Sequence, residues 1–200
     1  MNCSEYENIK HFTYVEYCDY LQEKHGIGKY DYMTKSWNKN PKCTRTKEGL
    51  IAHHKYENCA IMLSKKEIAM LNPFEWQLAK NIVHCDYLEH LLLHVLICEY
   101  PSEEKNDFEA VSIGGIINFI VPELNDFYSG WITKQEWQKK CHELIKGNKD
   151  VYLTIIKRFK SSCKNNPFFS EDCLFKSFNE QYGLWSSKQN KSIYNDIKSL

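Results

Sequence analysis

Histidine is the residue type whose spacing points most clearly to chemistry in this sequence. Eight histidines occur, and five of them lie close together in the chain, namely His53, His54, His84, His90 and His94. The last two are four residues apart in a segment that we expect to be helical, so their imidazoles share one face and can share one metal ion. Neutral imidazole is a common ligand for zinc and other transition metals. The alternative is that both are ordinary hydrogen-bonded histidines of the core or the surface.

The adjacent pair His53 and His54 predicts a division of roles. The run from residue 48 to residue 54 is short and mostly apolar, which is consistent with a strand. Neighbouring side chains on a strand point to opposite faces. One histidine can therefore face a metal ion while the other faces the reacting phosphate or water, as a ligand and a general base must.

The order of these residues resembles that of a known family. In chain order they are the pair His53 and His54, then Asn81, Ile82 and Val83, then Glu89, His90 and His94. This pattern, over residues 43–98, resembles the ββα-metal (His-Me) finger of HNH endonucleases, most closely the colicin-type and phage branch. The resemblance implies a β-hairpin that carries the paired histidines and a following helix that carries further ligands.

The resemblance also implies a role for each residue and a reaction. His54 would be the general base that activates water, and Asn81 would brace the hairpin loop and orient that base. His53, His90 and His94 would hold one divalent metal ion, with Mg, Mn and Zn as the candidates. The ion would stabilise charge on the phosphate and on the leaving 3′ oxygen. The implied activity is hydrolysis, by nicking, of DNA phosphodiester bonds.

Two features depart from the compact form of this motif. His54 and Asn81 are 27 positions apart, and the segment 64–80 is expected to insert a helix between them. No Cys-x-x-Cys pair is present, so a structural zinc site could only be built from unevenly spaced thiols. Those cysteines are Cys43, Cys59, Cys85 and Cys98. Glu57 is either an outer carboxylate that orients a histidine or a solvated loop acid.

Charge is uneven along a chain whose net charge is zero. Residues 24–66 carry ten Lys or Arg against three acids, residues 134–164 carry nine against three, and residues 67–126 carry eleven acids against two lysines. The two basic blocks are expected either to face phosphates or to be ordinary solvated surface. The residues beside the motif expected to contact nucleic acid are Arg45, Lys47 and Lys55.

The overall pattern predicts a mostly helical α+β protein. A small ββα-metal module at 43–98 is expected between an N-terminal helix with a basic loop, 1–42, and a helical C-terminal region, 99–200. Helices are expected over 6–25, ending at Gly26, and over 87–99, with Asp86 as N-cap. Nine cysteines without a signal sequence, and no long apolar stretch, predict a reduced cytoplasmic protein that does not span a membrane.

Three functions remain open at this level. The first is the nuclease acting on double-stranded DNA. The second is a catalytically degenerate HNH-like protein that binds a protein partner, such as a phage-encoded inhibitor or regulator, through its helical C-terminal region. The third is a purely structural zinc protein, which explains His90 and His94 but gives no role to His54 and Asn81.

Overall fold

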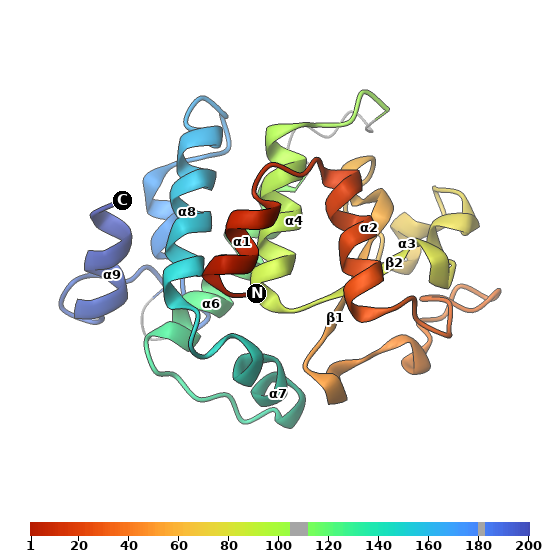
Figure 1. The fold of residues 1–200 in the computed structure, drawn as a ribbon, viewed down its shortest axis with the longest axis horizontal. Coiled ribbons are helices and arrows are strands. Elements are labelled where there is room, and N and C mark those ends of the chain that lie inside the picture. Colours follow the sequence, from red (N-terminus) through yellow and green to blue (C-terminus); the bar gives the residue numbers. More distant parts are fainter. Residues whose placement is uncertain (105–111, 180–182) are drawn as a thin grey trace.

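The computed structural model describes residues 1–104, 112–179 and 183–200 (Figure 1). As expected from the sequence, the protein is a mostly helical α+β structure, and its sheet in the described residues has two strands. The elements in chain order are α1 (Cys3–Ile9), α2 (Tyr14–His25), β1 (Ile51–His54), α3 (Lys66–Ala69), β2 (Ile82–Cys85), α4 (Tyr87–Glu99), α5 (Ile113–Gly115), α6 (Val121–Tyr128), α7 (Glu136–Ile145), α8 (Lys149–Cys163) and α9 (Lys191–Lys198). None of the described helices has the length and apolar character needed to cross a bilayer.

The two strands form an antiparallel pair that leads directly into α4. His53 lies opposite Val83, and His54 lies opposite Ile82. Because side chains alternate along a strand, the two histidines belong to opposite faces of the pair. Val83 packs in the main core with α2 and α4, whereas Ile82 packs in a smaller cluster with residues of the segment 32–43.

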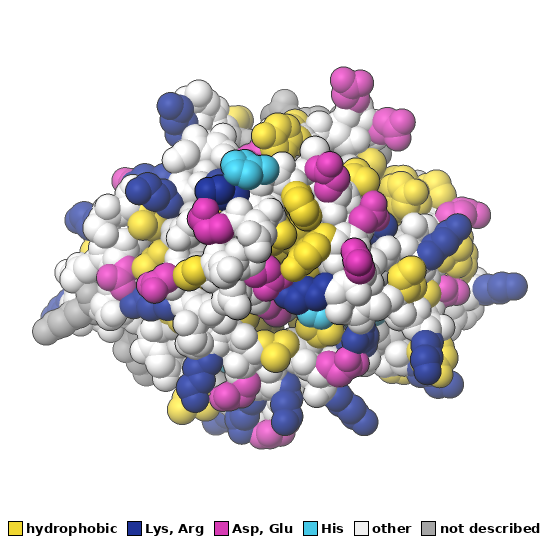
Figure 2. Space-filling view, viewed as in Figure 1, with side chains coloured by type: hydrophobic (Ala, Val, Ile, Leu, Met, Phe, Trp, Pro, Cys, Tyr) yellow, Lys and Arg dark blue, Asp and Glu magenta, His cyan; other side chains and the backbone are white. Residues whose placement is uncertain are grey.

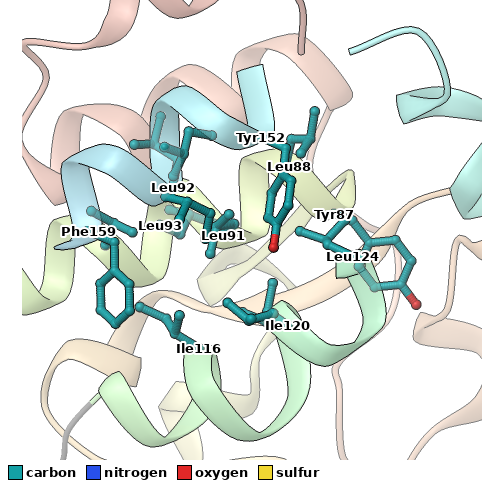
Figure 3. Packing of buried hydrophobic residues seen from close by; sticks show 14 of the residues in the cluster. Tyr87, Leu88, Leu91, Leu92, Leu93, Ile116, Ile120, Leu124, Tyr152 and Phe159 are labelled. Carbon is teal, nitrogen blue, oxygen red and sulfur yellow. The ribbon is translucent and has the colours of Figure 1, made fainter. Parts of the chain in front are cut away.

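Helix α4 occupies the centre of the molecule and positions the histidines that it carries. Its N-cap, Asp86, accepts hydrogen bonds from the backbone N–H groups of Leu88 and Glu89, and Glu89 returns a bond to the Asp86 N–H in a capping box. Leucines on several sides of the helix are fully buried. Figure 3 shows them packed against Tyr152 and Phe159 of α8 and against the apolar face of the segment 116–124. The helix therefore has little freedom to rotate or slide.

The N-terminal helix expected over 6–25 is instead two helices, α1 and α2, with a break at residues 10–13. Thr13 begins the second helix, because its side chain accepts from the Glu16 N–H while the Glu16 carboxylate accepts from the Thr13 N–H. This reciprocal capping stabilises a helix start that the apolar spacing alone conceals. The break sets the direction of α2 and brings Tyr14, its first residue, against β1.

Candidate metal centre

Four side chains from three separate elements converge beside α4. His53 comes from β1, Glu57 from the short 3-10 turn Lys55–Asn58, and His90 and His94 from α4. One potential ligand atom from each lies within 4.8 Å of the others. The structure thus brings together the three histidines that the sequence offered as ligands, and it adds Glu57. This group of four could hold a metal ion.

The ring of His53 is held with one nitrogen directed at the other three residues. Its Nε2 lies 2.8 Å from the Tyr14 hydroxyl, which also lies 3.1 Å from the Lys55 carbonyl oxygen and 3.2 Å from that of His54. When the hydroxyl donates its proton to one of these carbonyls, the hydroxyl oxygen accepts from His53 Nε2–H. Nδ1 then carries the lone pair, and it is buried without a hydrogen-bond partner in the described residues. Such outer hydrogen bonds fix metal-binding histidines.

Ser112 holds the ring of His94 in the same way from the other side. Its hydroxyl donates to the His94 carbonyl oxygen at 2.7 Å and accepts from His94 Nδ1–H at 2.8 Å. The lone pair of His94 is therefore on Nε2, which faces His90 Nε2 at 3.2 Å. Ser112 adopts φ +69°, a left-handed conformation that is strained for a residue with a side chain.

Three of the separations between these ligand atoms match a tetrahedral site. Metal–nitrogen and metal–oxygen bonds of about 2.0–2.1 Å in tetrahedral geometry place neighbouring ligand atoms about 3.3–3.4 Å apart. His90 Nε2 and His94 Nε2 are 3.2 Å apart, and Glu57 Oε2 is 3.4 Å from His53 Nδ1 and 3.5 Å from His94 Nε2. The other separations lie within 4.8 Å, so small shifts of these side chains would complete the coordination of an ion.

His54 does not belong to this group of ligand atoms; it contacts the ligand Glu57 instead. Glu57 Oε1 lies 3.2 Å from His54 Nδ1 and accepts from the His54 backbone N–H at 3.3 Å. The other ring nitrogen, Nε2, lies 3.1 Å from Gln77 Oε1, and Gln77 is oriented because its Nε2 donates to the Leu63 carbonyl oxygen. The ring is fully buried, and both of its nitrogens are in contact with oxygen atoms.

Asn81 lies at the end of the insertion and contacts no ligand. Its Nδ2 donates to the Glu75 carbonyl oxygen at 2.7 Å, within the 3-10 turn Phe74–Gln77. Asn81 thus stabilises the turn from which Gln77 contacts His54. The helix expected within the insertion is also present, as the short α3.

Burial and mutual contact set the charges of the group. Burial lowers the pKa of His53 to about 3, and it also lowers the pKa values of His90 and His94. Burial would raise the pKa of Glu57, but the histidines around it, chiefly His53, outweigh that effect and hold the pKa well below its usual range. Three neutral imidazoles and one carboxylate are the protonation states that bind a divalent cation.

The three residues predicted to contact nucleic acid differ in whether their charges are already paired within the protein. The Arg45 guanidinium is already bound within the protein: it forms an ion pair with Glu48 and donates a hydrogen bond to the His25 carbonyl oxygen. Lys55 pairs with Asp19 at 2.7 Å. Lys47 is exposed, and in the part of the chain that the structure describes it makes no ion pair.

The sequence left several residues of the site undetected or undecided. Glu57 carries a local signal, since it lies three and four positions after the two adjacent histidines. Tyr14, Gln77 and Ser112 lie far from the ligands in sequence and carry none. A zinc site of Cys43, Cys59, Cys85 and Cys98 is not formed, because the described residues gather only the His and Glu ligands within metal-binding distance.

In comparisons with known proteins, no family model, no curated protein and no solved structure matches this chain. The interpretation of the site therefore rests on its own geometry.

Proposed function

We propose that this protein is a metal-dependent endonuclease that nicks DNA, with one divalent ion held by His53, His90 and His94. The observation that carries the proposal is the arrangement of these three ligands. An antiparallel strand pair supplies one histidine and the following helix supplies two, and Tyr14 and Ser112 hold the rings of His53 and His94.

In this proposal a bound divalent ion supplies Lewis-acid stabilisation of the phosphate. His54 supplies the base. Its Nε2 lies 3.1 Å from Gln77 Oε1 and its Nδ1 lies 3.2 Å from Glu57 Oε1, so both ring nitrogens face acceptor oxygens. Nδ1 can accept a proton from water only when it carries no proton of its own and no longer contacts Glu57. Glu57 Oε1 now lies where a water molecule would have to sit to give its proton to Nδ1. Reaction therefore requires the Glu57 carboxylate to move away from His54.

The Glu57 carboxylate also favours a second candidate function. Structural zinc sites are closed by four protein ligands, whereas catalytic sites keep one position open. With Glu57 as a fourth ligand, and with His54 fully buried, the site fits a metal-stabilised protein that binds a protein partner. The two candidates differ in whether Glu57 can be displaced.

Plasmid nicking with magnesium, manganese or zinc separates the two candidates. We expect the parent to nick, and His54→Ala to lose nicking while it keeps its metal. Glu57→Ala should still bind metal through three histidines and nick at least as fast as the parent. His84→Ala is the matched control, because His84 is buried on the same strand pair and its ring hydrogen-bonds the Cys43 carbonyl oxygen, away from the ligand group.

One result would contradict the nuclease, and another would contradict only the assignment of its base. If the parent and Glu57→Ala both hold metal and neither nicks with any ion, the second candidate is correct. If His54→Ala nicks like the parent, His54 is not the base.

A further inference from the structure

A basic surface lies where the segment before β1 meets α7. The two segments are in contact at Gly49. A Cβ at this position would lie only 2.7 Å from the Lys140 carbonyl oxygen, so a larger residue would not fit, and the φ of +80° also favours glycine. The two basic blocks of the sequence, far apart along the chain, are therefore adjacent in space. Figure 2 shows Lys and Arg side chains along the lower margin of the molecule, where Figure 1 places α7 and the segment leading to β1.

The lysines of this surface are available for a ligand. Lys29 and Lys42 line a groove of about 390 Å³ together with Arg45. Lys47 lies two residues before Gly49, and Lys140 is the residue of α7 whose carbonyl oxygen Gly49 approaches. All four lysines are exposed, and within the described residues none of them makes an ion pair. The acids nearby are paired: Glu48 with Arg45, Glu136 with Lys139 of α7, and Glu143 with Lys146, the residue after α7.

Three aromatic residues of the same segment contact other side chains, although Tyr30 is 45% exposed in the groove. Lys42 Nζ lies 5.6 Å from the ring centroid of Tyr30, and Lys39 Nζ lies 5.1 Å from that of Tyr32. Trp37 packs edge-on against Phe74. Proteins that bind single strands combine a basic groove with open aromatic faces, whereas contacts to a duplex backbone need cations alone.

We infer that this basic surface, formed by Lys29, Lys42, Lys47 and Lys140, binds the phosphate backbone of double-stranded DNA. The inference rests on the proposed function and deepens it, because it names where the substrate duplex is held. It also shifts the expected contacts away from Arg45 and Lys55, whose charges are already paired.

The test is fluorescence anisotropy with a labelled duplex of about 20 base pairs, in EDTA to block cleavage and again with zinc, at several salt concentrations. The variant carries Lys→Glu at all four positions of the surface. The control carries the same charge change at four exposed lysines on other parts of the molecule that make no ion pair in the described residues. These are Lys157, Lys164, Lys188 and Lys198.

The surface variant should bind the duplex at least about tenfold more weakly at about 0.1 M salt. Its slope of log affinity against log salt should fall by about three to four, since each phosphate contact contributes about 0.9. The control should stay within about threefold of the parent, as expected for charges remote from the duplex. Equal losses in both variants would overturn the inference, because only net charge would then matter. Unchanged binding by the surface variant, or tighter binding of a single strand than of the duplex by the parent, would also overturn it.

The two proposals fail separately. If the parent binds the duplex through this surface but nicks no plasmid with any metal, the inference about the surface is supported and the nuclease proposal is wrong. If the parent nicks and the surface variant binds and nicks equally well, the nuclease proposal is supported and the inference about the surface is wrong.

Discussion

Replacing Tyr14 with Phe should weaken metal binding, although Tyr14 touches no metal. Its hydroxyl fixes His53 by accepting from Nε2–H at 2.8 Å, and so leaves the lone pair on Nδ1. Without the hydroxyl, a fully buried N–H loses its partner and the other tautomer becomes accessible. Removing an outer partner of this kind costs about 10- to 100-fold in metal affinity, or about 1.4–2.7 kcal/mol.

The assay is a zinc competition titration against a chromogenic chelator, and Tyr17→Phe is the matched control. Tyr17 lies on the same helix and is also buried, but its hydroxyl donates to the Met1 sulfur, at 3.9 Å, and not to a residue of the metal site. We expect Tyr17→Phe to bind zinc as the parent does. Equal zinc affinity in Tyr14→Phe and the parent would refute the assignment of the His53 tautomer. An equal loss in both variants would point to a general effect on packing.

Three further predictions follow from the same geometry. Gly115→Ala should lower zinc affinity in the same titration, because its Cβ would lie 3.1 Å from His94 Cε1, whereas Gly114→Ala should not, since its Cβ would meet only a side-chain nitrogen 4.0 Å away. Zinc at about 100 times its dissociation constant should raise the free energy of unfolding by about 2.7 kcal/mol in urea denaturation, and no rise would mean that zinc does not bind the folded state preferentially. Burial lowers the pKa of His53 to about 3, against about 6.5 in an unfolded chain. The unfolded chain therefore binds more protons between these values, and the metal-free protein should lose about 1.4 kcal/mol per pH unit from this residue alone as the pH falls below about 6.5. Urea denaturation in EDTA at about pH 7.5 and pH 5 measures this, and equal stability at both would contradict the burial of a neutral His53.

The part of the site that the sequence predicts is the part encoded by local spacing. Four residues separate His90 from His94, and Asp86 caps the helix that carries them, so both features follow from the helical period and from capping chemistry. Adjacent histidines on a strand must point to opposite faces, and His53 and His54 do.

The rest depends on tertiary contacts that spacing does not encode. Whether Glu57 points inward is decided by the 3-10 turn after β1, in which its carboxylate accepts from the His54 N–H. Tyr14 reaches the site only because the first expected helix is broken before it, and Ser112 only because the chain returns across α4. The roles of His54 and Asn81 came from the resemblance and stay predictions.

The central claim is a single metal ion bound by His53, His90 and His94, with Glu57 within reach as a fourth ligand. X-ray absorption spectroscopy of the zinc-loaded protein tests it most directly. We expect one zinc per chain with nitrogen and oxygen ligands at about 2.0–2.1 Å and with the outer-shell pattern of imidazole rings. Sulfur ligands at about 2.3 Å, or no zinc retained by the folded protein, would contradict the claim.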